Sequence, residues 1–354
     1  MPASIRDVAK LAGVSLATVS NVCTGNKYVR PELARRVNDA IKQLGYTPNP
    51  MASSLRTNKS YTVGVILPTF YHPFHARILK GIQDAALLSR YLINVYATDY
   101  DIKREFDSLE RFVHTMPDGV IIASYANDDK EYGGKTIEIL ERLANGKRKV
   151  PIISLERYYK VPGVESILSD YEQSACDAVT YLHKLGHSKI AHISGPMDRD
   201  ASVKRYDGYC RALREHHIRF NPDYVRSGLF TPESGYHCMR DLMLKTDITA
   251  VFAANDETGI GAIRALKDLG KRMPQDVAVI GTDNIYVGTL IEPSLSTVDV
   301  PSYKMGRMAM EKMLEFVAGH ARPNMEQPVY LDTTIIPRRS TELECETTWD
   351  LYDW

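Results

Sequence analysis

The segment "IRDVAKLAGVSLATVSNVCTG" (residues 5–25) contains two short helical patterns separated by a turn residue. The first pattern has one apolar face, formed by Ile5, Val8, Ala9 and Ala12. Gly13 can form a tight turn, and Ser15 is a favourable N-cap for a second helix in which Val19 and Val22 point inward. Two helices joined in this way form a helix-turn-helix unit.

A third helix is predicted from Pro31, in its first turn, to Leu44, with Gly45 at its C-cap. Many three-helix bundles bind no nucleic acid, so the charge of the head is needed to tell a DNA-binding bundle from a purely structural one. The whole chain of 354 residues has zero formal net charge, yet residues 1–60 hold nine basic and three acidic side chains, a balance of +6. A basic head on an acidic body favours a polyanion such as DNA as the partner of the head.

The second helix also has the side chains that a DNA-reading helix needs. Leu16, Ala17 and Asn21 are short and are predicted to point outward. A recognition helix places such N-terminal side chains in the major groove, where apolar groups contact thymine methyls and Asn pairs with adenine.

From Tyr61 onward, apolar runs alternate with longer helical patterns. The predicted strands are "TVGVILP", "LINVYAT", "DGVIIAS", "VPIISLE", "KIAHISG", "TAVFAAN" and "DVAVIGTD", and the helices include residues 74–90, 172–185 and 257–269. This alternation is typical of βαβ units, so we expect two doubly wound α/β lobes with parallel sheets. Ligands of such sheets bind beyond the carboxyl ends of the strands.

Between head and body lies "PNPMASSLRTN" (residues 48–58), which has the composition of a linker. Met51 to Arg56 nevertheless contains no helix breaker, and Met51 and Leu55 are spaced i, i+4. A helix this short is marginal in water on its own.

"IRDVAKLAGVSLATVSNV", "VRPELARRVNDAIKQLGYTPNPMASSLRTN" and "VGVILP" occur in the order head, hinge and first core strand. In this they resemble the lactose-repressor (LacI/GalR) family, and the resemblance covers almost the whole chain. It implies a helix-turn-helix head and two lobes of periplasmic-binding-protein type. It also implies a dimeric transcriptional repressor of a palindromic operator, controlled by a small-molecule effector, with a sugar or sugar derivative expected in the cleft.

The resemblance implies a DNA-binding set in head and hinge: Ser15, Leu16, Ala17, Thr18, Asn21, Asn26, Tyr28, Ala52, Ser53, Leu55 and Arg56. It also implies that the hinge becomes helical only when two copies meet on DNA, with Leu55 wedged into the minor groove. Leu16, Ala17, Asn21 and Ser53 differ from residues that are frequent in relatives, so the operator sequence is left open.

The resemblance places an effector-binding set at the strand ends of the body: Phe74, His75, Glu156, Arg199, Arg205, Phe230, Asn255 and Asp283. Arg205 belongs to an R-x-x-G element, and Asp283 closes a V-x-G-x-D strand end. Without the family pattern, such residues are more often core aromatics, turn formers or surface ion pairs. Carboxylates, a planar guanidinium and aromatic faces suit a polyol. The second arginine, Arg199, would also suit an acidic effector.

Other patterns were weighed as catalytic or metal sites. "GIGAIR" (residues 259–264) lacks the third glycine of a dinucleotide loop, and the pairs His183/His187 and His72/His75 have poor geometry for a metal. We find no catalytic motif, so we expect neither an enzyme nor a cofactor. The competing hypotheses are a sugar-binding transport component, which the basic head disfavours, and a sugar-acting enzyme, for which turnover of a bound sugar is the test.

The expected domains are a head at 1–47, a hinge at 48–60, an effector-binding and dimerisation body at 61–340 and a tail at 341–354. The tail is acidic and aromatic and is not a leucine heptad, which favours a dimer; it is expected either to be loose or to dock on the body. No signal peptide or long apolar run is visible, and five scattered cysteines suit a reducing compartment, so we expect a cytoplasmic protein without membrane contact.

Overall fold

The computed structural model describes residues 3–24, 27–47, 59–124 and 132–345. The chain divides into two compact units, Met1–Tyr61 and Thr62–Trp354, and each is described by itself. Among the described residues, no helix has the length and apolar character that crossing a bilayer demands.

The head consists of the three predicted helices, α1 (Ile5–Ala12), α2 (Leu16–Thr24) and α3 (Pro31–Leu44). Ser4 caps α1, and Gly13 ends it at φ 63°, a left-handed conformation that glycine adopts without steric cost. The Ser15 hydroxyl accepts a hydrogen bond from the Thr18 amide at 3.1 Å, as an N-cap does. Val8, Val19 and Val37 are fully buried where the helices meet.

Within the described residues of the body, each of two sheets has six strands. The first sheet has the order β11-β5-β4-β3-β1-β2, and its pairs are parallel. Its strands are β1 (Thr62–Leu67), β2 (Leu92–Ala97), β3 (Gly119–Ala123), β4 (Ile152–Leu155), β5 (Val164–Ser169) and β11 (Val329–Leu331). The helices of this first lobe are α5 (Pro73–Leu87), α6 (Ile102–Thr115), α7 (Gly133–Asn145) and α13 (Ser302–Ala318).

The second sheet has the order β12-β10-β9-β8-β6-β7, and β12 is antiparallel to β10 while the other pairs are parallel. Its strands are β6 (Ile190–Ser194), β7 (Val225–Ser227), β8 (Ala250–Ala253), β9 (Ala278–Thr282), β10 (Ser296–Asp299) and β12 (Thr334–Ile336). The helices of this second lobe are α8 (Tyr171–Lys184), α9 (Asp200–Glu215), α10 (Pro232–Lys245), α11 (Asp256–Asp268) and the short α12 (Val287–Leu290), with a 3₁₀ turn at Pro222–Tyr224.

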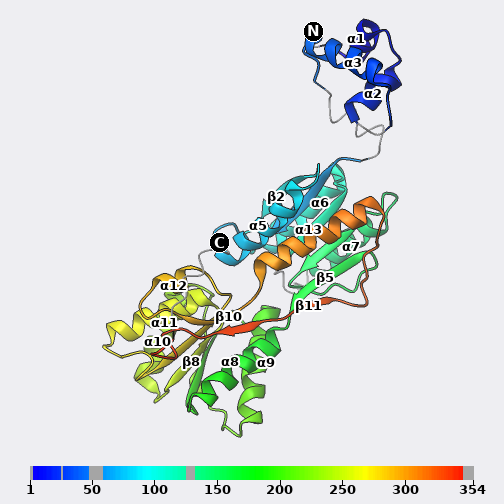
Figure 1. Cartoon of the computed structure of the whole chain (residues 1–354). Coiled ribbons are helices and arrows are strands. Elements are labelled where there is room, and N and C mark those ends of the chain that lie inside the picture. Colours follow the sequence, from blue (N-terminus) through cyan, green and yellow to red (C-terminus); the bar gives the residue numbers. More distant parts are fainter. Residues whose placement is uncertain (1–2, 25–26, 48–58, 125–131, 346–354) are drawn as a thin grey trace. The chain divides into compact units, whose positions relative to one another are not determined.

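The chain passes between the two lobes at three places (Figure 1). Asp170 links β5 to α8, residues 300–301 link β10 to α13, and residues 332–333 link β11 to β12. The two doubly wound lobes and the seven predicted strands are confirmed. Strands β5, β7, β10, β11 and β12 were not predicted; β7, β11 and β12 have only three residues each, a pattern too brief to separate from that of loops.

Folding of the second lobe continues past residue 340, where the sequence placed the start of the tail. Thr341 is buried, and the Tyr181 hydroxyl donates to the Glu342 carboxylate at 2.5 Å. The first residues of the predicted tail therefore pack on the body, whereas its aromatic end at 346–354 lies outside the described residues.

Glycines let paired helices approach each other closely. A Cβ atom on Gly306 of α13 would lie 1.9 Å from the carbonyl oxygen of Ile78 in α5, and one on Gly81 would lie 2.2 Å from that of Tyr303. The pair α8 and α9 meets in the same way at Gly208, and the pair α10 and α11 at Gly235 and Gly261. Each close pair brings backbone against backbone, so an added methyl group has no flexible side chain to displace.

We expect Gly306→Ala to destabilise the body by about 1–3 kcal/mol, because the methyl group would force α5 and α13 apart. The matched control is Gly134→Ala in α7, where no atom of the described residues lies within 4 Å of the added Cβ. The control should be neutral or stabilising by up to about 1 kcal/mol, through helix propensity. Urea unfolding of the three proteins measures both effects, and equal midpoints would contradict the close packing.

Candidate functional site

A cavity of about 440 Å³ lies between the lobes, at the carboxyl ends of strands from both sheets. From the first lobe it is lined by residues that include Thr69, His72, Phe74 and His75 after β1 and Tyr100 after β2. From the second lobe it is lined by residues that include Arg199 and Arg205 after β6, Phe230 after β7, Asn255 and Glu257 after β8 and Asp283 after β9. The structure thus brings together seven of the eight residues predicted for effector binding.

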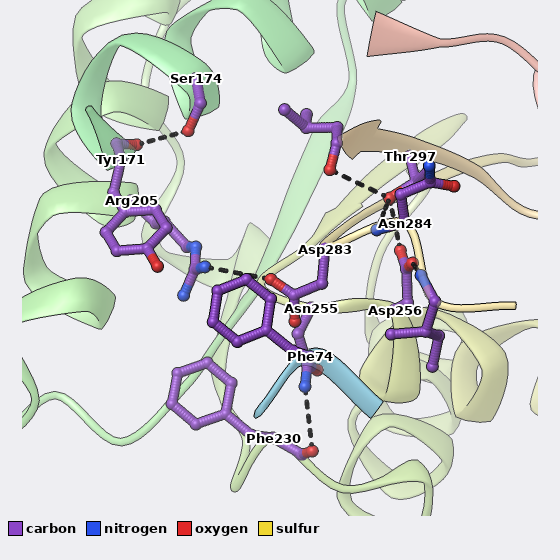
Figure 2. Close-up of polar contacts among 12 residues, drawn as sticks. Phe74, Tyr171, Ser174, Arg205, Phe230, Asn255, Asp256, Asp283, Asn284 and Thr297 are labelled. Atoms are coloured by element: carbon purple, nitrogen blue, oxygen red, sulfur yellow. Dashed lines mark hydrogen bonds and ion pairs between the residues drawn. The ribbon is translucent and has the colours of Figure 1, made fainter. Parts of the chain in front are cut away.

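Arg205 and Asp283 face each other in this cavity with little access to water (Figure 2). Arg205 Nη2 lies 3.5 Å from Asp283 Oδ1, and the two side chains are 5% and 7% exposed. The guanidinium also lies 4.1 Å from the ring centroid of Tyr171, a cation–π contact. Burying two charges is costly unless they are paired, so each makes the other tolerable at this position.

Burial raises the pKa of Asp283 to about 7; the Arg205 charge opposes this rise and the Glu257 charge adds to it. Without a ligand the Asp283 carboxyl is therefore divided between protonated and ionised forms near neutral pH. A ligand that donates hydrogen bonds to the ionised form would favour that form.

A buried carboxylate beneath the cavity holds the Asp283 loop in place. Asp256 is fully buried; its Oδ2 accepts from the Ile285 amide at 2.8 Å and its Oδ1 from the Thr297 hydroxyl at 2.6 Å (Figure 2). Asp283 and Asn284 adopt φ angles of 106° and 54°, conformations that cost free energy for residues with side chains. The Asp256 contacts offset part of this cost and keep the Asp283 carboxyl directed into the cavity.

Asn255 joins two segments of the second lobe. Its Oδ1 accepts from the Thr258 amide at 3.0 Å and caps α11, while its Nδ2 donates to the Phe230 carbonyl at 3.2 Å. The Phe230 ring lies so close to Gly195 that a Cβ atom there would be 2.1 Å from the ring. The aromatic wall near Arg205 thus depends on the Asn255 amide in one loop (Figure 2) and on Gly195 in another.

The first lobe supplies a mainly aromatic wall. Phe74 and His75 are buried at the start of α5, and the Arg199 guanidinium lies 5.5 Å from the ring centroid of Tyr100. Burial lowers the pKa of His75 well below its ordinary value, with His72 contributing further, so His75 is neutral. The wall therefore presents ring faces and neutral polar groups.

Glu156 is the exception among the predicted effector residues. It directly follows β4, has φ 66°, is 8% exposed and is not among the residues that line the cavity. The position of a residue at a strand end places it at the correct edge of the sheet but does not set the direction of its side chain. Conversely, the cavity lining also includes Tyr100, Glu257 and His72, which the sequence does not predict as effector residues.

The predicted DNA-binding residues of the head fall partly within the described residues. Leu16 is 45% exposed, Ala17 is exposed and Asn21 is half-buried, all on α2. Ser15 and Thr18 are joined by a side-chain hydrogen bond of 2.9 Å, and Tyr28 is 86% exposed. Asn26, Ala52, Ser53, Leu55 and Arg56 lie outside the described residues, as does the predicted hinge helix.

The patterns set aside in the sequence have structural roles. Residues 259–264 lie within α11, and His183 Nδ1 is 3.2 Å from the His187 carbonyl, which suits a helix end. In the part of the chain that the structure describes, no group of three or more His, Cys, Asp or Glu side chains is arranged to hold a metal ion.

The buried Asp283 gives a testable pH dependence. Its pKa is raised from 3.8 to about 7 in the folded protein, so between these values the folded state binds more protons than the unfolded state. Its contribution to the free energy of unfolding should therefore fall as pH rises from 4 to 7, by an amount on the order of a few kcal/mol. In Asp283→Asn this contribution should vanish. Urea unfolding of the wild type and of Asp283→Asn at pH 4.5 and 7.5 measures how much the free energy of unfolding changes with pH in each protein. An equal change in the two proteins would contradict a protonated Asp283.

Comparisons with known proteins agree with this architecture. Residues 4–49 match the family described as "Bacterial regulatory proteins, lacI family", and residues 179–341 match the "Periplasmic binding protein-like domain". Catabolite control protein A of Priestia megaterium is 34% identical over 319 residues, which is 90% of this chain and 93% of the relative.

Two solved structures are similar over nearly the whole chain. The complex of the transcriptional regulator CelR with cellobiose is 31% identical, with a TM-score of 0.67, and the match covers 96% of this chain and 99% of that one. The lac repressor dimer bound to operator and the anti-inducer ONPF is 25% identical, with a TM-score of 0.82 and the same coverage. These relatives are transcriptional regulators and not enzymes. The chain belongs to the LacI family of bacterial DNA-binding transcriptional regulators.

Proposed function

We propose that this protein is a homodimeric repressor of a palindromic operator, controlled by a polyhydroxylated effector, a sugar or sugar derivative, that binds in the cavity between the lobes. The carrying observation is the composition of that cavity: a buried Arg205–Asp283 pair, the amide of Asn255 and the rings of Phe74 and Phe230. The similar regulator CelR has been solved with cellobiose, which supports this ligand class.

Each group has a role that follows from its chemistry. Asp283 accepts hydrogen bonds from ligand hydroxyls and Arg205 donates a planar pair of N–H groups, while the phenyl rings cover the apolar face of a sugar ring. Arg199 is 21% exposed and lies at 3.9 Å from Asp198, a carboxylate that is itself 65% exposed. Arg199 also lines the cavity, where its guanidinium is positioned to meet an acidic group on the effector.

Control of DNA binding follows from a ligand that touches both lobes. Because the lobes are joined at three short crossings, their relative angle is the property that a bound effector is expected to change. An effector that binds one angle more tightly shifts the population toward it, and operator affinity changes by the coupling free energy. The predicted hinge segment at 48–60 transmits the change, and the protein acts where its operator DNA is, in the cytoplasm.

Arg205→Ala should abolish effector binding and leave operator binding intact, because an effector group left unpaired in a closed site costs about 1–3 kcal/mol, or more if charged. The measurement is a thermal-shift screen of sugars, sugar acids, sugar phosphates and nucleobases on wild type and variant, since a ligand selective for the folded state raises the Tm. Arg214→Ala is the matched control, because Arg214 lies on the same helix and is exposed.

The expected outcome is a sugar or sugar derivative that raises the Tm of the wild type and of Arg214→Ala but not of Arg205→Ala. A shift that survives in Arg205→Ala would place the effector elsewhere. A shift caused by nucleobases alone would overturn the proposed ligand class.

Leu55→Ala should leave the Tm of the free protein nearly unchanged and weaken operator binding by about 1–3 kcal/mol, the value of burying one leucine side chain. The loss should be confined to specific binding, because only the kinked operator centre opens a base step to accept the wedge. Tm, operator affinity and affinity for unrelated DNA are measured on one preparation. A lower Tm of the variant, with an unchanged ratio of specific to non-specific affinity, would assign Leu55 to an ordinary folded core.

A further inference from the structure

His72 lies at the start of α5 and has one ring nitrogen committed to that helix. Its Nδ1 is 3.3 Å from the Phe74 amide nitrogen and caps the helix as an acceptor. Phe74 is 3% exposed, so water does not readily replace this acceptor. Leaving the amide unsatisfied would destabilise the start of the helix.

The other ring nitrogen points across the cavity to the second lobe. His72 Nε2 lies 3.3 Å from Asn255 Nδ2. The orientation of the Asn255 amide is set by two backbone groups, because the Thr258 amide donates to Oδ1 and the Phe230 carbonyl accepts from Nδ2. The group that faces His72 is therefore an N–H donor.

These two contacts make incompatible demands on one imidazole. Both would require a lone pair on the ring, whereas a neutral imidazole carries one lone pair and one N–H. Burial, with the Arg205 charge adding to it, lowers the pKa of His72 to about 4, so the ring is neutral at physiological pH. Helix capping needs the lone pair on Nδ1, which leaves an N–H on Nε2 directed at the Asn255 N–H.

We propose that His72 and Asn255 form an oxygen-binding subsite, in which one N–H donor from each lobe converges on a single acceptor oxygen of a polyol effector. This rests on the proposed function. Without the oxygen the two donors oppose each other across the lobe boundary; with it, both are satisfied. An effector that presents an oxygen at this point would thereby join the lobes in the arrangement seen here, and one that lacks it would not.

The deciding measurement is the His72 tautomer in the effector-free full-length protein labelled with ¹⁵N-histidine, observed at pH 7. The His72 signals are assigned by their loss in His72→Asn, and His114→Asn, at an exposed position on α6, controls for unrelated shifts. We expect the proton on Nε2. A proton on Nδ1, or a charged ring, would overturn the subsite, because His72 would then accept directly from Asn255 or would not cap α5.

Two further readouts separate the subsite from a simple contact between the lobes. Asn is itself a good N-cap but is too short to reach Asn255, so His72→Asn should keep the wild-type Tm while His72→Ala lowers it by roughly 2–4 °C. An equal loss in both variants would show that the contact with Asn255 is itself stabilising and would overturn the proposal.

Water is the simplest probe of the oxygen position. Crystals grown without polyol should show an ordered water within about 2.7–3.2 Å of both nitrogens. The absence of an ordered water within that distance of both nitrogens would overturn the subsite. All three readouts are taken without effector, so their failure leaves the result of the sugar screen untouched, and failure of the screen leaves the tautomer result untouched.

Discussion

The parallel direction of neighbouring strands is the constraint on which this molecule depends. In each lobe the pairs are parallel, except for β12 on β10, so successive strands end at the same edge of their sheet. Polar and aromatic side chains that are far apart in sequence, from Thr69 to Asp283, therefore lie around one cavity. Apolar side chains on the strands meanwhile pack under helices on both faces, which keeps the site on a rigid support.

The free energy released by that packing offsets unfavourable features at the site itself. Asp283 and Arg205 are buried, and Phe230, Asp283 and Asn284 adopt positive φ angles. Such features persist only where surrounding structure determines them, and here Asp256 and the Asn255 amide do so. The donors of His72 and Asn255, which we propose oppose each other, would belong to the same class. A ligand that relieves such features would gain affinity.

The glycine contacts would let each lobe move as a rigid unit, as the proposed function requires. Helices α5 and α13 are held with backbone against backbone at Gly81 and Gly306, so the first lobe has little freedom to deform. Close pairs at Gly208, Gly235 and Gly261 do the same in the second lobe. Motion is then expected at the three crossings, where few atoms join the lobes, and a ligand that touches both lobes acts directly on that motion.

The amino-acid sequence by itself determined the helix-turn-helix head, its caps, the two doubly wound lobes and the edge at which a ligand site must lie. These follow from local periodicity, turn chemistry and the order of motifs, which short stretches of chain carry. Only the tertiary structure decided which strand-end side chains share the cavity. It excluded Glu156 from the lining, added Tyr100 and Glu257, and extended the second lobe past Ser340. It also placed His72 opposite Asn255, 183 residues away in sequence. The direction of a side chain and its partner across two lobes depend on packing between distant segments, and no local pattern in the sequence encodes that.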